Sequence, residues 1–290
     1  MRTTLCIGVR SFYISHMSTQ PPLFDQTRLE RNRQSATEMF LQERAADGIQ
    51  ERLAEVNRTF TAPAIVTPFP QLWRGRLENV LCVPPSDLLS LGERQHDLVV
   101  HSLSLHAAND PVGQLVQARL ALKPDGLMIA TTFGGQTLHE LRASLAEAEI
   151  ALTGGLSPRV SPMADIREFG GLLQRAGFTL PVADRDRFDV QYRDLRHLLR
   201  DLKAMGEGNA QTARQKTIAP KDLFSLAERI YRDRFSDGAE TLTATFEMIT
   251  LTGWAPAPDQ PVALRPGSAS HRLAEALNTT EVAIAPDGLK

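Results

Sequence analysis

The sequence predicts an α/β fold whose sheet is mostly parallel and has an antiparallel edge. Three observations lead to this prediction. Residues 97–132 have the pattern of a strand, a helix and a second strand, and residues 64–67 form an earlier apolar strand. Two late β-rich runs, 179–190 and 240–254, enclose a helical segment, as expected for an antiparallel edge interrupted by an insertion. The sheet is expected to be shortened in its first half.

The central strand–helix–strand unit has about the length of a right-handed crossover between parallel strands. Asp97–His101 is a short valine-rich run, typical of a buried parallel strand. Asp110 can cap the next helix, and Pro111 suits its first position because that N–H lacks a partner in any helix. After a turn at 123–126 the second strand is expected at Leu127–Thr132. The helix presents one apolar stripe, formed by Val112, Leu115, Val116, Leu120 and Leu122.

Apolar residues at helical spacing predict several more helices. Gln26–Val56 is expected to form one or two charged amphipathic helices, and Thr137–Leu152 another helix with one buried side. Residues 161–165 open a further helix with Pro162 near its first turn, and Gly177 caps its end.

The last helices belong to an insertion of about residues 191–238 between the two late strands. Asp194–Gly206 and Pro220–Phe235 are its two helices, and they lie where a lid over the ligand cleft would come from. The domain as a whole is expected to span residues 24–256.

The two ends of the chain are expected to lie outside this domain. Residues 1–23 are predicted to be a disordered tail, or to result from a start codon assigned too early. Residues 257–290 are rich in Pro, Ala, Gly and Ser, which predicts a flexible tail.

The composition excludes several classes of protein. With 34 acidic and 32 basic residues the charges nearly balance, which argues against nonspecific nucleic-acid binding. No apolar run is long enough to span a bilayer, so at most a peripheral membrane association is expected. The two cysteines, Cys6 and Cys82, give neither a metal-ligand spacing nor a disulfide framework, and no metal is expected. A reducing compartment fits best, either the bacterial cytoplasm or the mitochondrial matrix.

The segment after the first strand, Ala64–Thr67, lacks the glycines with which such sheets hold a nucleotide-like cofactor. Its sequence is PFPQLW, residues 68–73, in which two prolines remove backbone donors and two aromatic residues add bulk. Residues 68–96 leave room for about one crossover, where the standard fold has two. Asp87 and Glu93 are the available acids for the cofactor ribose, and solvated loop charges are the simpler interpretation of both.

The candidate site residues follow the ends of the two central strands, where ligands of parallel sheets bind. His106 could act as a catalytic base, although a histidine packed at a strand edge is the simpler interpretation. Glu140 and Arg142 could meet a substrate or partner, with surface positions as the favoured alternative. The candidate cofactor residues are Ser102, Leu103, Ser104 and His106, and those for a substrate or partner are Phe133, Gly134, Glu140 and Arg142.

Several stretches resemble one known family. They are DLVVHSLSLH (97–106), LKPDGLMIATTFGGQTLHELRASLAEAE (122–149), GGLSPRVSPMADIREFGGLLQRAGF (154–178), DLRHLLRDLKAMGEGNA (194–210) and FDQTRLERNR (24–33). These residues are similar to the methyltransferase-like assembly factors of respiratory complex I, the factor 5 family, across about residues 24–270. The malonyl-carrier-protein methyltransferases of biotin synthesis are more distant relatives.

The resemblance implies the Rossmann-like fold of class I methyltransferases and S-adenosylmethionine (SAM) in the cleft. It also implies modification of a complex I subunit, which in the family is arginine hydroxylation rather than methyl transfer. The family's glycine-rich motif would align with Ile65–Trp73, where this chain departs from it. Whether the chain is an enzyme is therefore left open.

Three hypotheses remain. The first is a working SAM enzyme that acts on a protein. The second is a non-catalytic descendant, a pseudoenzyme that binds and stabilises a respiratory subunit during assembly. The third is a protein that binds some other small ligand in the remodelled cleft.

Overall fold

The computed structural model describes residues 21–261 except 237 and 239, together with 272–276, 278 and 279. The chain divides into one unit that ends at Pro256 and a second, Ala257–Lys290, whose described part includes the short helix α8 (Leu273–Ala276). Most of the expected terminal segments, 1–23 and 257–290, lies outside the described residues, so their disorder stays a prediction. No helix among the described residues is long and apolar enough to cross a membrane.

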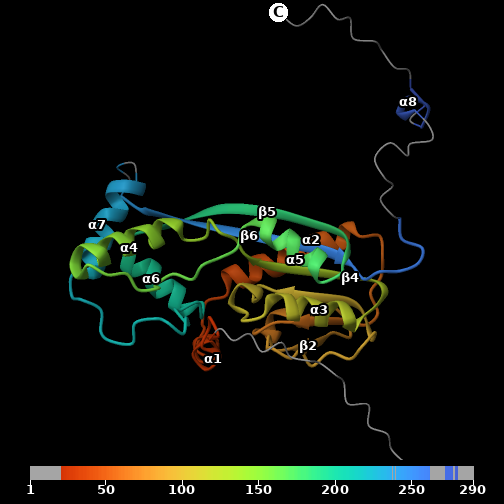
Figure 1. The fold of residues 1–290 in the computed structure, drawn as a ribbon, viewed down its shortest axis with the longest axis horizontal. Coiled ribbons are helices and arrows are strands. Elements are labelled where there is room, and N and C mark those ends of the chain that lie inside the picture. Colours follow the sequence, from red (N-terminus) through yellow and green to blue (C-terminus); the bar gives the residue numbers. More distant parts are fainter. Residues whose placement is uncertain (1–20, 237, 239, 262–271, 277, 280–290) are drawn as a thin grey trace, which may run out of the picture. The chain divides into compact units, whose positions relative to one another are not determined.

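The first unit contains one six-stranded sheet in the order β2-β1-β3-β4-β6-β5. The strands are β1 (Pro63–Val66), β2 (Leu81–Val83), β3 (His96–Ser102), β4 (Leu122–Phe133), β5 (Thr179–Tyr192) and β6 (Leu242–Trp254). The first four in this order run parallel, and β6 is antiparallel to both β4 and β5 (Figure 1). The predicted Rossmann-like class, a mostly parallel sheet with an antiparallel edge, is confirmed.

The shortening of the first half is also confirmed. Doubly wound sheets typically continue past the second strand to a third one at the edge. Here β1 leads through the 3-10 turn η1 (Pro70–Trp73) to β2, and the chain then enters β3 directly. Strand β2 is therefore one edge of the sheet. It ends at Val83, immediately before Pro84 and Pro85, which cannot donate to a neighbouring strand.

The described residues contain eight α-helices. The amino-terminal pair is α1 (Gln26–Gln34) and α2 (Phe40–Glu55), and the central ones are α3 (Pro111–Ala121), α4 (His139–Thr153) and α5 (Ile166–Arg175). The insertion contributes α6 (Leu195–Ala204) and α7 (Leu223–Phe235), and α8 lies in the second unit. Asp110 caps α3 by accepting the N–H of Gly113, with Pro111 in the first position, as predicted.

The parallel part of the sheet is covered on both faces because its strands are apolar on both sides. One face packs against α2 and includes Ile65, Leu98 and Val100, together with Trp73 of η1. The other face packs against α3 and α5 and includes Val99. This layering explains why β3 is buried along its whole length.

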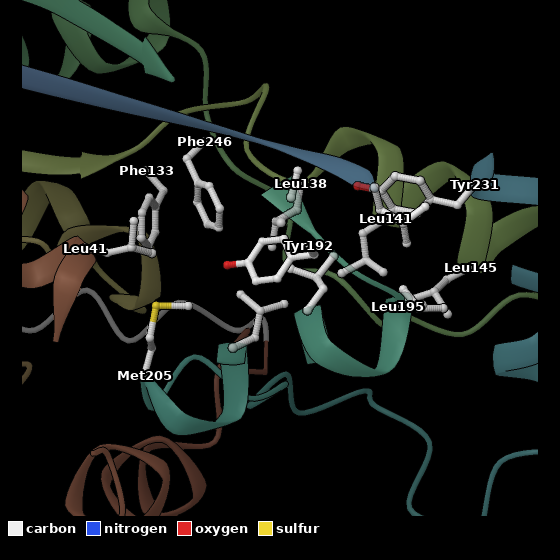
Figure 2. Close-up of a cluster of buried hydrophobic side chains, with 14 of the residues drawn as sticks. Leu41, Phe133, Leu138, Leu141, Leu145, Tyr192, Leu195, Met205, Tyr231 and Phe246 are labelled. Carbon is white, nitrogen blue, oxygen red and sulfur yellow. The ribbon is translucent and has the colours of Figure 1, made fainter. Parts of the chain in front are cut away.

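The helical insertion builds a second part of the core at the far ends of β5 and β6 (Figure 1). Leu138, Leu141 and Leu145 of the α4 segment meet Leu195 of α6 and Tyr231 of α7 (Figure 2). The predicted apolar side of the helix at 137–152 is thus confirmed. Its neighbours come from the insertion, so the insertion is packed against the domain.

Two local predictions are wrong. Pro162 lies before α5 and not in its first turn, because Asp165 caps the helix with both bonds of a capping box with Glu168. The expected turn at 123–126 lies within the bounds of β4, where the pairing with β3 jumps from Leu122 to Leu127. Asp125 there has a φ of 59°, which a short polar residue tolerates. The glycine at 177 ends α5 with a φ of 82°, as predicted.

Replacing Trp73 by Ala is expected to lower the free energy of unfolding by about 3–5 kcal/mol, because a fully buried aromatic side chain leaves a cavity. Trp73 is 0% exposed, whereas Leu88 in the nearby loop is 73% exposed. Leu88→Ala is therefore the control, with an expected change within about 0.5 kcal/mol. Urea titrations of both variants measure the difference, and equal small losses would show that η1 is not anchored in the core.

Candidate functional site

A chamber of about 230 Å³ lies at the carboxyl ends of β3 and β4. It forms there because η2 (Leu105–Ala107) follows β3 and carries His106 inward, while Phe133 ends β4. Figure 2 shows Phe133 beside Phe246, and their ring centroids are 6.4 Å apart. Most of the wall is apolar, and it includes Phe24, Leu29, Leu41, Phe133, Leu138, Leu141, Leu145, Leu199, Leu202 and Phe246.

Charged residues interrupt the apolar wall of the chamber, namely Arg159, Lys203 and the pair formed by His106 and Glu207. His106 Nε2 lies 3.2 Å from the Glu207 carboxylate, and their side chains are 4% and 16% exposed. The His106 ring also packs on Phe133, with centroids 4.7 Å apart. His106 Nδ1 and Glu207 Oε1 have no hydrogen-bond partner among the described residues. The pair therefore leaves one imidazole nitrogen and one carboxylate oxygen of the buried wall without a hydrogen-bond partner among the described residues.

The Glu207 carboxylate stays charged despite its burial. Burial opposes the charged form, but attraction to His106 and Arg33 outweighs it, so the pKa of Glu207 lies below its usual 4.5. The chamber therefore holds a fixed negative charge at neutral pH. Such a charge in an apolar wall attracts a cationic or hydrogen-bond-donating group.

The candidate cofactor residues lie in different environments. Ser102, Leu103 and Ser104 are each at most 2% exposed. Leu103 has a φ of 40°, and its carbonyl accepts a hydrogen bond from Gln42. Of the four residues predicted for this role, His106 alone lines the chamber.

Ser104 contributes to a buried histidine rather than to a wall of the chamber. Gln114 donates its amide to the Ser86 carbonyl, so its oxygen accepts from His101 Nε2 at 2.8 Å. His101 Nδ1 then accepts from the Ser104 hydroxyl at 3.2 Å. Both ring nitrogens are satisfied in the neutral form, and burial lowers the pKa of His101 to about 4.

The candidate partner residues lie close together in sequence but have different roles. Phe133 lines the chamber. Gly134 donates its N–H to the Glu247 carbonyl, and a Cβ there would come within 2.5 Å of the Glu247 carboxylate. A close contact between β4 and β6 thus explains this glycine.

The surface interpretation of Glu140 and Arg142 is wrong. Glu140 is 5% exposed and accepts hydrogen bonds from the backbone N–H and the hydroxyl of Thr245. The half-buried Arg142 donates to the backbone carbonyls of Gly135 and Thr137. Both side chains tie the start of α4 to other segments, Glu140 to Thr245 of β6 and Arg142 to residues 135–137.

A second hollow of about 570 Å³ lies between α1 and the carboxyl ends of β1 and β2. We call it the proline cleft. Its wall consists of Gln26, Leu29, Glu30, Arg33, Gln34, Pro68, Pro84, Pro85, Ser86 and Asp87. This is the position where sheets of this class hold their nucleotide-like ligand.

The proline cleft does not provide the backbone cradle that SAM receives from a glycine loop. The Thr67 N–H donates to the Val83 carbonyl, and the Phe69 N–H to the Thr67 hydroxyl. Pro68 and Pro70 have no N–H to offer. The residues present therefore do not fit a cofactor bound in that way. Asp87 and Glu93 are exposed, as expected for loop charges.

Comparison with known proteins places these features in a family context. No family model matches the chain. The protein named mitochondrial arginine-hydroxylase NDUFAF5 in Danio rerio is 37% identical over 189 residues, which are 65% of this chain and 59% of the relative. For the Mus musculus protein the values are 38% over 206 residues, 71% of this chain and 60% of the relative. About two thirds of this chain is thus similar in sequence to NDUFAF5 proteins.

More distant matches include the malonyl-[acyl-carrier protein] O-methyltransferase of Laribacter hongkongensis, 32% identical over 193 residues, 64% of this chain and 62% of the relative. The solved structure of BH2331 from Bacillus halodurans has a TM-score of 0.47 and 11% identity, covering 72% of this chain and 98% of its own. The chain spans about 60% of the length of the NDUFAF5 proteins that it matches.

The sequence prediction missed Glu207 and Arg33 as site residues. Both lie in runs that resemble the complex I assembly factors, Glu207 in LKAMGEGNA and Arg33 in FDQTRLERNR. Their position as polar residues inside these runs was the signal that could have marked them as site residues. Glu207 contacts His106 across 101 positions of sequence, and Arg33 meets the prolines of the cleft through the packing of α1, so neither contact is visible locally.

Stability is expected to fall by about 2 kcal/mol between pH 7 and pH 5 on account of His101. The pKa of His101 is about 4 in the folded chain against about 6.5 when exposed, so the unfolded chain takes up the proton first. The contribution of neutral His101 to the free energy of unfolding is complete above pH 6.5 and is lost as the pH falls toward 4. Urea titrations at both pH values measure it.

The matched variant is His101→Asn, which cannot titrate. Between pH 7 and pH 5 this variant is expected to lose about 2 kcal/mol less stability than the wild type. An equal loss in both proteins would show that another group is responsible.

Proposed function

We propose that this chain is a methyltransferase-like assembly factor of respiratory complex I that binds a client subunit through the chamber. Homology to NDUFAF5 supports the assembly role. The observation that carries the proposal is the charged carboxylate of Glu207 in a mostly apolar wall that also includes Arg159 and Lys203. A client side chain that is apolar along its length and polar at its tip matches these walls.

An arginine side chain has this form. Its methylene stem would lie along the Leu and Phe side chains, and its guanidinium would donate to the Glu207 carboxylate, which lines the chamber. Arg159 in the same wall does not compete for Glu207, because it pairs with Glu149 at 2.6 Å. The NDUFAF5 relatives are named arginine-hydroxylases, which agrees with this substrate class.

The proposed role rests on binding and not on SAM chemistry. The donors that would hold the cofactor are absent or already bonded within the β1–β2 connection. A pseudoenzyme that holds its client needs the chamber but no cofactor cradle. The proposed location follows the relatives, which are mitochondrial, with the bacterial cytoplasm as the equivalent compartment.

Catalysis in the chamber is the second candidate. The His106–Glu207 pair supports it, because a carboxylate on one imidazole nitrogen fixes the ring and leaves the other nitrogen to accept a proton. Nδ1 of His106 has no partner in the described part of the chain. In this candidate His106 is the proton acceptor and Glu207 positions it.

Filling the chamber is expected to abolish client binding. Met163 lines the chamber, so Met163→Trp adds bulk there, and recovery of complex I subunits with the tagged full chain is expected to fall at least tenfold. Ile218→Trp is the matched control, because Ile218 is 97% exposed and lies outside the wall. Quantitative mass spectrometry of co-purified proteins measures recovery, and undiminished recovery with folded Met163→Trp would contradict the proposal.

Neutralising the carboxylate tests the identity of the side chain. Glu207→Gln keeps the shape but loses the charge, and binding of an arginine-containing client peptide is expected to weaken roughly 10- to 100-fold. Isothermal calorimetry with the arginine peptide and its norleucine counterpart measures the effect. The norleucine peptide should bind both proteins equally, and an equal response to both peptides would exclude arginine recognition.

Titration with SAM separates the two candidates. We expect no binding heat at millimolar SAM, because Pro68 and Pro70 lack an N–H and the N–H groups of Thr67 and Phe69 are already bonded. Binding in the micromolar range would instead favour the enzyme. Pro68→Gly combined with Pro70→Gly is the accompanying variant, since restored donors could create affinity that the wild type lacks.

A further inference from the structure

The starting observation is a buried arginine in α1. Arg33 is 9% exposed, and its Nε and Nη2 atoms are buried without a hydrogen-bond partner among the described residues. Burial lowers the pKa of Arg33, opposed by attraction to Glu207, but a guanidinium remains protonated under all ordinary conditions. The structure thus contains a buried positive charge whose donors are not used.

The nearest acid does not neutralise this charge by direct contact. Glu207 is paired with His106, and none of the ion pairs within the described ranges includes Arg33. The other groups that act on this region, His101 and His106, are bases and offer no negative charge. Buried charges in proteins are normally paired, because an uncompensated charge costs several kcal/mol. The Glu207 carboxylate thus favours the charged form of Arg33 from nearby, but among the described residues no anion accepts a hydrogen bond from Arg33 Nε or Nη2.

The proline cleft provides the space for such an anion. Arg33 forms part of its wall, together with Pro68 after β1 and Pro84 and Pro85 after β2. The prolines cannot donate hydrogen bonds, and the Ser86 hydroxyl is already bonded to the Leu88 carbonyl. Recognition of a ligand in this cleft consequently depends on a side-chain donor, and Arg33 is a buried one.

The rim of the cleft limits the size and charge of the ligand. Glu30 and Asp87 are exposed acids in its wall, and Glu30 accepts a hydrogen bond from Gln34 at 3.1 Å. Exposed charges are screened by salt, whereas the buried guanidinium is not. The rim therefore disfavours large polyanions and admits a small ligand with one anionic group.

From these contacts we propose that the proline cleft binds a small anion, a carboxylate or phosphate group, through Arg33. The site replaces the cofactor cradle that this chain lacks, and it goes beyond the client-binding role of the chamber. Leu29 lines both hollows, so α1 is the wall between them. An anion in the cleft would also offset the positive charge of Arg33, which acts on Glu207 and, through it, on the pair with His106.

The test uses the purified full chain, with inorganic phosphate and malonate as separate probes at constant ionic strength set by chloride. Calorimetric titration and thermal unfolding are expected to show millimolar or tighter binding of at least one probe and a rise in Tm. The preferred probe distinguishes phosphate from carboxylate chemistry. No complex I subunit is present, so the result does not depend on client binding.

The decisive variant is Arg33→Met, which is expected to lose at least tenfold in affinity and the anion-induced rise in Tm. Arg31→Met is the matched control, because Arg31 is an exposed arginine in the last turn of the same helix. If Arg33→Met does not fold, Arg33→Lys takes its place, and weaker binding is expected because the bidentate donor is lost. Wild-type chain that binds neither probe, or an Arg33 variant that binds like Arg31→Met, would overturn the proposal.

Discussion

The pairing of β6 between β4 and β5 is the interaction on which the rest of the domain depends. Leu127–Phe133 pairs with one side of β6 and Thr179–Tyr192 with the other, so one strand joins the parallel sheet to the helical insertion. The Gly134 N–H and the Glu140 carboxylate extend the contact beyond the end of β4. Phe246 in the middle of β6 then lies against Phe133, and the chamber forms around them.

The two hollows differ because the strands and connections differ between the two halves of the sheet. On the side of β4 and β6 the strands are long and the insertion covers their ends, which gives an apolar chamber with a charged pair. On the side of β1 and β2 the connection is reduced to one turn with buried aromatic residues. Helix α1 reaches both hollows, which makes its short charged sequence more important than its length suggests.

Local sequence signals predicted most of the fold. Asp110 and Pro111 fix the start of α3, and Gly177 fixes the end of α5, because each acts within one turn of its own position. The exposure of Glu140 and Arg142 could not be predicted in this way. Their burial depends on Thr245 and on the 135–137 segment, and the first of these is 105 positions away in the sequence.

The site was predicted less well for the same reason. His106 could be placed at a strand end from its position after the valine-rich run, but its partner Glu207 is 101 positions away. Arg33 carried no local sign of burial, because all residues from 30 to 35 are charged or polar. Only the packing of α1 against the ends of the strands turns a surface-like helix into the wall of a site.

The loss of a third strand has a consequence for how this molecule avoids self-association. Removing an outer strand would normally uncover a ladder of free amides and carbonyls along β2, to which a strand of another molecule could add. Strand β2 is three residues long, and Pro84 and Pro85 follow it directly. The brevity of the strand and the two imino acids leave too few donors for a foreign strand to extend the sheet. Pro84 and Pro85, which line the proline cleft, thus also disfavour aggregation through this edge of the sheet.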